Sequence, residues 1–315
     1  MSTRTPRDLT QGPIGRNLLL FSLPILGGNI AQSLNGSVNA VWIGRHLGED
    51  ALTAAANANN IMFFLLGSMF GLGMAASILI AQAMGARDTA QARRTMGSSA
   101  TFFIGLSVLI AIGGWWLARH LLAWMGTPAP SLPLAEAYLR VIFLAMPALY
   151  AFAFLAAALR GAGDSRTPFR FLLVAVLLDI AFNPLLIFGI GPFPKLGIAG
   201  SAWATLLSQT LALGALLLHL RRKRHVLWLG RKDAALLLPQ PRIVQALVLK
   251  GVPMGLQMML ISLAMIAMMT MVNGFGTATA AGYGAALQLW TYVQMPAMAI
   301  GAACSSMAAQ NVGAG

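Results

Sequence analysis

An aspartate lies in the middle of an apolar run, where acidic side chains are rare. The run from residue 171 to 190 reads FLLVAVLLDIAFNPLLIFGI and is long enough to cross the hydrocarbon core of a membrane. An ionised carboxylate at the centre of that core costs at least ~2.5–3.5 kcal/mol, so its presence at Asp179 indicates a functional group. The alternative is a protonated carboxyl that only hydrogen-bonds to a neighbouring helix. The other seven carboxylates of the chain fall in loops or at the ends of apolar runs.

Polar groups close to Asp179 in the sequence could complete an ion site. Pro184 has no N–H and clashes with the carbonyl four residues back, so we expect a kinked helix in which the Ile180 carbonyl is unpaired. Asn183 precedes this proline and is therefore biased away from α geometry. Because residues four apart share a helix face, Asp179 and Asn183 should present a carboxylate and an amide to the same space. The carboxylate could then carry a proton, or these oxygens could hold a sodium ion.

A second set of polar residues lies in the first apolar run. Gln32, Asn35 and Asn39 follow i, i+3, i+7 spacing, so they should form one polar stripe on a helix. The alternative for such neutral residues is ordinary hydrogen bonding between helices, worth about 0.6 kcal/mol each. Two further prolines inside apolar runs, Pro24 and Pro253, predict additional helix kinks.

The composition indicates the solvent in which these elements fold. Apolar residues make up 58% of the chain and charged residues 9%, with a mean hydropathy of +0.74, whereas a soluble domain carries ~25% charged residues. Long apolar runs without strict two-residue alternation predict an all-α membrane protein and exclude an outer-membrane barrel. We predict eight transmembrane helices, at residues 17–43, 52–82, 97–118, 135–159, 169–190, 198–220, 245–273 and 282–309.

The net charge of +13 is explained by membrane topology and needs no nucleic-acid partner. Of the 21 Lys and Arg residues, 17 precede the first apolar run or follow the second, fourth and sixth. Only Arg45, Arg119 and Lys195 lie on the opposite side. The positive-inside rule therefore places the N-terminus in the cytoplasm. We expect an integral protein of the bacterial plasma (inner) membrane, in contact with membrane lipid.

An internal repeat relates the start of the chain to its end. LGEDALTAAANA at 47–58 corresponds to FGTATAAGYGAA at 275–286, and AQAMGAR at 81–87 corresponds to AQNVGAG at 309–315. Both copies are offset by 228 residues, and Pro24 corresponds to Pro253 with a slip of one residue. Six predicted helices separate the copies, so both repeats should cross the membrane in the same direction.

The repeat also predicts the domain organisation. Residues 1–220 should form a six-helix N-terminal lobe, and residues 221–244 a basic cytoplasmic linker. Residues 245–315 should form a partial second lobe that contains helices seven and eight. Because the first repeat has six helices and the second only two, we expect a C-terminally truncated chain that lacks about four helices of a longer protein.

Residues for metal binding or covalent catalysis are scarce. Cys304 is the only cysteine, so neither a disulfide framework nor a thiolate metal site is expected. The four histidines fall in loops or at the ends of runs and form no ligand cluster. The apolar runs hold no paired carboxylates and no activated serine, so we expect neither an enzyme nor a cofactor, apart from the coupling ion considered below.

Several motifs together resemble one family of membrane proteins. In chain order they are GPIGRNLLLFSLPILGGN, NAVWIGRHLG, RGAGDSRTPF, NPLLIFG, LGIAGSAWATLLSQ and AAQNVGAG. The chain is similar, over essentially its whole length, to the multidrug and toxic compound extrusion (MATE) family, in particular to its DNA-damage-inducible subgroup. The resemblance implies two six-helix lobes around a central cavity. It also implies export of organic, often cationic, compounds in exchange for protons or sodium ions. Lipid-linked oligosaccharide flippases of the same superfamily are the alternative.

The resemblance implies ion-coupling roles for particular residues of the first lobe. Relatives have an aspartate where this chain has Asn39, and they have N-x-x-x-D-P where it has Asp179-x-x-x-Asn183-Pro184. Thr205 resembles a family position that helps to line the same site. Proton loading would then fall on Asp179 alone.

Substrate-cavity candidates lie on helices one and seven. They are Gln32, Asn35, Gln257 and Met258. Helix seven is rich in methionine, whose flexible thioethers suit a promiscuous binding wall, although contact with lipid is the alternative for most of them. We expect a monomer with a small organic substrate.

The charge asymmetry makes a testable prediction about orientation. Single cysteines introduced at Arg45 and Lys195, with Cys304 replaced by serine, should react with a membrane-impermeant maleimide in intact cells. Cysteines at Arg94 and Arg222 should react only after the membrane is permeabilised, because they lie on the cytoplasmic side. Labelling of positions 94 and 222 alone in intact cells would contradict the orientation.

Overall fold

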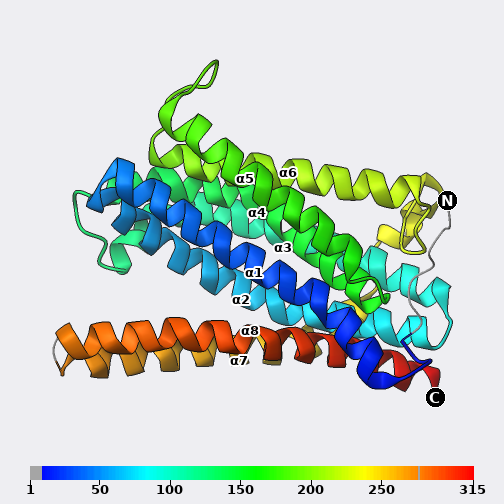
Figure 1. The fold of residues 1–315 in the computed structure, drawn as a ribbon. Helices are drawn as coiled ribbons and strands as arrows, with labels where there is room; N and C mark the ends of the chain where they lie inside the picture. Colours follow the sequence, from blue (N-terminus) through cyan, green and yellow to red (C-terminus); the bar gives the residue numbers. More distant parts are fainter. Residues whose placement is uncertain (1–8, 276) are drawn as a thin grey trace.

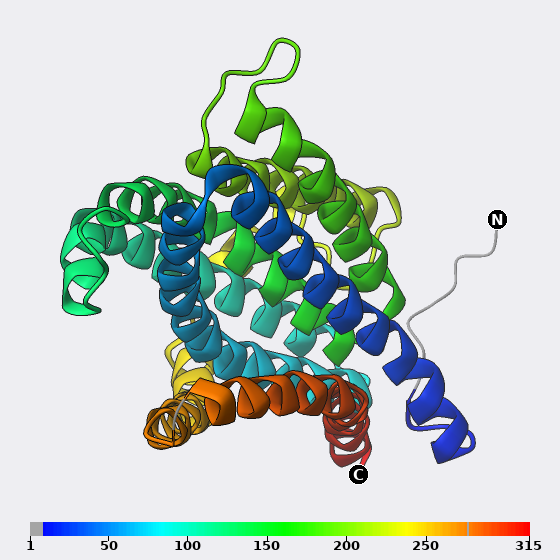
Figure 2. The ribbon, with the colours of Figure 1, turned by 60° about the vertical axis from the view of Figure 1, so that its left-hand side comes forward.

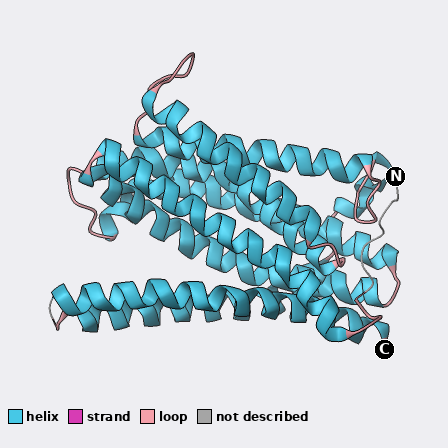
Figure 3. Ribbon diagram, in the orientation of Figure 1, coloured by secondary structure: helices cyan, strands magenta, loops and turns pink. Residues whose placement is uncertain are grey.

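The computed structural model describes residues 9–275 and 277–315, and in them the chain is almost entirely helical, with no strand (Figure 3). Eight long helices carry the fold, and one short 3₁₀ helix, η1, lies between the sixth and the seventh. Their bounds are α1 Ile14–Leu47, α2 Glu49–Gly85, α3 Thr89–Trp124, α4 Leu132–Gly161, α5 Arg166–Phe188, α6 Ile198–Arg222, η1 Arg231–Leu237, α7 Pro241–Asn273 and α8 Thr277–Ala314.

The eight helices coincide with the eight predicted apolar runs, which confirms the all-α membrane class. Within the described residues, α1 to α7 each contain a stretch long and apolar enough to cross a membrane. Most of the helices are longer than their apolar runs. Helix α2 has 37 residues, which at 1.5 Å per residue is about 55 Å, well beyond the ~30 Å hydrocarbon core. The helix ends therefore extend into the interfacial regions.

Helix α4 is at the centre of the first six helices, where it packs against α2, α3 and α6. Its buried residues include both large and small side chains, and Phe143, Met146 and Tyr150 are fully buried. The Tyr150 hydroxyl donates a hydrogen bond of 3.0 Å to the backbone carbonyl of Leu65 on α2. A polar group at this depth is thus paired inside the protein, as the absence of water requires.

Helices α7 and α8 run side by side along one flank of the first six helices (Figures 1 and 2). Both pack against α2, and α8 also packs against α1. A Cβ atom added at Gly71 of α2 would overlap the backbone of Gly251 and Gly255 on α7. The two backbones therefore approach closely, through small residues of the kind that mediate helix packing in membranes.

The basic linker that follows α6 folds back onto the start of α3. The Thr101 hydroxyl donates to the Leu237 carbonyl at 2.6 Å, and Arg93 forms an ion pair of 2.6 Å with Asp233. The Asp233 carboxylate also accepts a hydrogen bond of 2.8 Å from the backbone N–H of Gly230. The segment that connects α6 to α7 is therefore held to the first six helices, although its composition predicted only a basic connection.

Adjacent glycines on α3 allow a test of the packing between α3 and α4. A Cβ atom at Gly114 would overlap the buried ring of Phe143, whereas one at Gly113 would meet nothing within 4 Å. Gly114→Ala should destabilise the protein by about 1–3 kcal/mol through overpacking. Gly113→Ala should be neutral or stabilising by up to ~1 kcal/mol, because alanine favours the helix. Thermal unfolding in detergent measures both, and equal effects would contradict the packing.

Candidate functional site

Asp179 is on α5, where it is in contact with α1 and α6, and only 2% of its surface is exposed. On the α1 side, the Asn35 and Asn39 amides each donate a hydrogen bond of 2.9 Å to carboxylate oxygen Oδ2. On the α6 side, the Thr205 hydroxyl donates to Oδ1 at 3.1 Å, and the Ser208 hydroxyl does so at 3.4 Å. Three helices thus converge on one buried carboxylate, which receives four donors.

Local sequence signals at both ends of α5 fix the position of this carboxylate. Asp164 accepts from the Thr167 backbone N–H at 2.9 Å and from its hydroxyl at 2.6 Å, so it caps the start of the helix. The helix ends at Phe188 and is followed by Gly189, whose φ of +71° is a left-handed conformation that glycine adopts without strain. The RGAGDSRTP motif therefore sets the start of the helix that carries Asp179.

Asn183 is fully buried one turn after Asp179, and its amide bonds to the backbone of that residue. Its amide donates 2.9 Å to the backbone carbonyl of Asp179, not to the carboxylate. The predicted departure of Asn183 from α geometry is wrong, because α5 continues through Asn183 and Pro184 to Phe188. The bias before proline is statistical, and here the side-chain hydrogen bond and the burial hold Asn183 in the helix.

The charge of Asp179 has no basic partner within the described residues. The ion pairs there join Arg93 to Asp233 and Arg140 to Glu136, both away from Asp179. A buried carboxylate without a counter-charge is strongly disfavoured in an apolar medium. Four hydrogen-bond donors stabilise the anion in part. A proton or a bound cation would neutralise it.

Several residues of the site also carry buried side-chain oxygens that are unpaired. The side-chain oxygens of Asn35, Asn39 and Asn183 are buried and have no hydrogen-bond partner among the described residues, and the same is true of the Ser201 hydroxyl. Buried polar atoms are nearly always paired in proteins. Hard cations take carboxylate and amide oxygens as ligands. This donor set therefore fits a small cation as well as a proton, while no cluster of three His, Cys, Asp or Glu occurs in the described part of the chain.

One residue of the site was missed from the sequence. Ser208 lies three residues after Thr205, so the helical spacing in AWATLLSQ could have revealed it.

The remaining predicted residues lie outside this cluster. Gln32 is exposed, so of the polar stripe on α1 only Asn35 and Asn39 bind Asp179. On α7, Gln257 is exposed, and Met258 is half-buried and faces Gly67 of α2. The two other predicted kink prolines, Pro24 and Pro253, lie within helices α1 and α7.

Comparisons with known proteins identify the family. The MatE family model matches residues 24–185 and 253–315, which is more than half of the chain. The probable multidrug resistance protein YoeA of Bacillus subtilis is 37% identical over 301 residues, which cover 96% of this chain and 65% of that protein. The FAD transporter of Shewanella oneidensis is 30% identical over 313 residues, 98% of this chain and 67% of that protein. The chain belongs to the MatE family, as its motifs predicted.

Solved structures share the fold. One shows the outward-facing conformation of a multidrug resistance MATE family transporter of the MOP superfamily, with a TM-score of 0.87 and 23% identity over 99% of this chain and 68% of that one. Another is a MOP superfamily transporter from Pyrococcus furiosus, with a TM-score of 0.89, 23% identity and the same coverage. The chain spans about two thirds of the length of the relatives it matches.

The hydrogen bond from α6 to the carboxylate can be tested by a near-isosteric change. Thr205→Val removes the donor to Asp179 and should cost about 1.5–3 kcal/mol of stability, because the acceptor is charged. Thr210→Val is the matched control: Thr210 is exposed and bonds only to the Leu206 carbonyl of its own helix, so the change should stay within ~0.5 kcal/mol. Thermal unfolding in detergent distinguishes them, and equal stability of the two variants would refute a charged acceptor.

Proposed function

We propose that the protein to which this chain belongs is a secondary antiporter of the bacterial plasma membrane. It exports organic, mostly cationic, compounds in exchange for protons or sodium ions, and Asp179 carries the coupling ion. The observation that supports this proposal is the buried carboxylate without a basic partner, held by α1, α5 and α6. Family membership and the multidrug resistance relatives support drug export.

The hydrogen bonds suggest where a proton would bind. A protonated carboxyl needs an acceptor for its O–H, and a hydroxyl can rotate from donor to acceptor whereas an amide N–H cannot. Thr205 and Ser208 both contact Oδ1, while the amides of Asn35 and Asn39 donate to Oδ2. A proton on Oδ1, facing α6, therefore keeps every hydrogen bond of the site with only hydroxyl rotation.

Sodium would use the opposite side of the carboxylate. The unpaired oxygens of Asn35, Asn39 and Asn183 belong to α1 and α5, next to Oδ2 and the backbone of Asp179. Turning over the amides of Asn35 and Asn39, so that each oxygen replaces its N–H group, would direct these oxygens and Oδ2 toward one cation, and the Thr205 hydroxyl on the Oδ1 side would be a further ligand. The proton would thus bind at Oδ1, whereas sodium would be held mainly around Oδ2.

The charge of the spans favours a cationic substrate over a lipid-linked phosphate. A flippase of the same superfamily would need basic groups in its cavity, but Arg140, within α4, is paired with Glu136 at 2.7 Å. Gln32 and Asn35 on α1, with Gln257 and Met258 on α7, are the proposed wall for the substrate. The Shewanella relative is named for FAD, so a flavin belongs among the test substrates.

We also propose that the N-terminus lies in the cytoplasm, because 17 of the Lys and Arg residues lie on that side. The protein is proposed to be a monomer surrounded by membrane lipid. It involves no nucleic acid, no enzymatic step and no cofactor other than the coupling ion.

Charge removal at the carboxylate tests the coupling role. In proteoliposomes that contain the intact gene product, Asp179→Asn should reduce gradient-driven efflux of a cationic dye to the level of protein-free vesicles. The protein should still fold, because the substitution keeps the shape of the side chain. The exchange Asp179→Asn with Asn183→Asp restores the arrangement that relatives have, and it should recover part of the activity. Separate pH and sodium gradients identify the coupling ion.

Asp50→Asn is the matched control for this experiment. Asp50 lies in the first turn of α2, outside the site, and accepts a hydrogen bond of 3.2 Å from Ser131. Removal of its charge should therefore leave efflux unchanged. Full gradient-driven efflux by Asp179→Asn would show that coupling occurs elsewhere.

A further inference from the structure

Helices α2 and α8 cross at their C-terminal ends with an unusually close backbone contact. A Cβ atom added at Gly85 of α2 would overlap the carbonyl of Gln310 on α8. In the same way, a Cβ atom added at Gly313 of α8 would overlap the carbonyl of Gln82 on α2. The contact is reciprocal: the glycine of each helix lies against the glutamine backbone of the other.

The internal repeat explains this reciprocity. Gln82 and Gly85 belong to AQAMGAR, and Gln310 and Gly313 are their counterparts, 228 residues later, in AQNVGAG. A contact in which the same patch is used on both sides is the signature of a two-fold axis. The two repeats therefore meet each other through the motif that they share.

Gln310 secures this crossing through its side chain, which is 3% exposed. Its amide oxygen accepts from the Leu9 backbone N–H at 3.2 Å, and its amide nitrogen donates to the Gly161 carbonyl at 2.9 Å. It thereby joins α8 to the segment before α1 and to the end of α4. Leu9 is buried in a small apolar cluster with Phe21, Ala303 and Met307.

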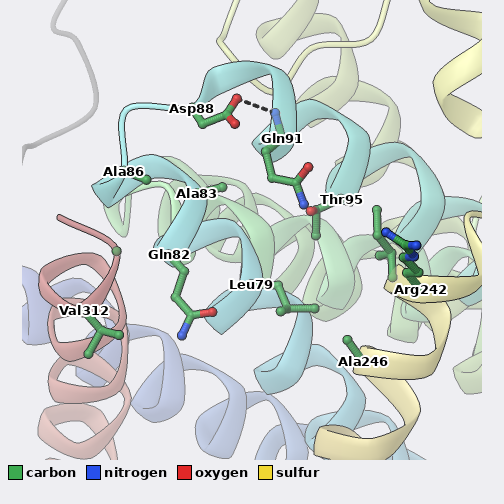
Figure 4. Close-up of a pocket in the computed structure, with 12 residues that line it drawn as sticks. Leu79, Gln82, Ala83, Ala86, Asp88, Gln91, Thr95, Arg242, Ala246 and Val312 are labelled. Carbon is green, nitrogen blue, oxygen red and sulfur yellow. Dashed lines mark hydrogen bonds between the residues drawn. The ribbon is translucent and has the colours of Figure 1, made fainter. Parts of the chain in front are cut away.

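A cavity of about 450 Å³ lies directly beside the crossing. Figure 4 shows Gln82 and Val312 on its α2 and α8 walls, with Thr95 and Ala246 from α3 and α7 on the others. On this side of the crossing, α2 and α3 are thus separated from α7 and α8. The close backbone contact is local, and the side chain that links the two sides of it is that of Gln310.

We propose that this crossing acts as a latch: the contact between α2 and α8 holds the cytoplasmic side of the protein closed. The hydrogen bonds of the Gln310 side chain stabilise the closed position. The proposal rests on the antiport function and orientation proposed above, which require that side to open and close. Separation of the helices would expose backbone carbonyls and two glutamines to water, which can replace the lost hydrogen bonds. The polar part of the contact is therefore suited to repeated opening, and the only apolar cluster described beside it is the small one that contains Phe21 and Met307.

Cysteine accessibility tests the latch without any transport measurement. Cys304, which is exposed, is first replaced by serine, and the buried Ser306 of α8 is changed to cysteine as a reporter. The intact gene product is placed in inside-out and right-side-out membrane vesicles. The rate of reaction with an impermeant maleimide is then measured for each variant.

Gly85→Ala and Gly313→Ala should each raise the labelling rate from the cytoplasmic face by roughly tenfold, which corresponds to a loss of about 1.4 kcal/mol of closure energy. Gly301→Ala on α8 is the matched control, since its Cβ atom would meet nothing within 4 Å. It should leave the rate unchanged. Gln310→Met, which adds no backbone clash and keeps the side-chain length, should also raise the rate and covers the case in which a glycine variant fails to fold.

Unchanged labelling in folded Gly85→Ala and Gln310→Met variants would overturn the latch, as would equal acceleration by Gly301→Ala. Faster labelling only from the opposite face would overturn its cytoplasmic placement. Because labelling needs neither substrate nor ion gradient, these results stand apart from the antiport proposal, which the Asp179→Asn efflux experiment tests.

Discussion

The arrangement of α1, α5 and α6 depends on one electrostatic constraint, a carboxylate enclosed by apolar helices without a basic neighbour. In such a medium every backbone and side-chain polar group must find its partner within the protein. The carboxylate of Asp179 meets this demand with donors from α1 and α6. The interaction ties three helices together, and the described residues supply no basic side chain to pair with the carboxylate.

Much of this site could be predicted from sequence because its signals are local or periodic. The depth of Asp179 in its apolar run, the four-residue spacing of Asn35 and Asn39, and the motif around Thr205 were the signals for it. The structure brings these residues to one carboxylate. Helix number was predictable for the same reason, since span length is set by membrane thickness.

The features that sequence reasoning missed depend on packing or on competition between local effects. Asn183 stays helical because its own amide and its burial outweigh the bias before proline. The docking of the linker on α3 depends on contacts of Arg93 with Asp233 and of Thr101 with Leu237, and the partners are 140 and 136 residues apart in the chain. Patterns in composition carry no information at that range.

Helix α1 connects two parts of the protein that have been described separately. Near its start, Phe21 packs in the cluster with Met307 of α8, and further along the same helix Asn35 reaches the carboxylate on α5. These contacts are 14 residues apart, or about 21 Å along a single rod. Pro24 lies between them and removes one bond of the helical ladder. Under the coupling role proposed for Asp179, the same helix that binds the carboxylate also packs against α8, so loss or gain of the carboxylate contact would be felt by a helix that belongs to both contacts.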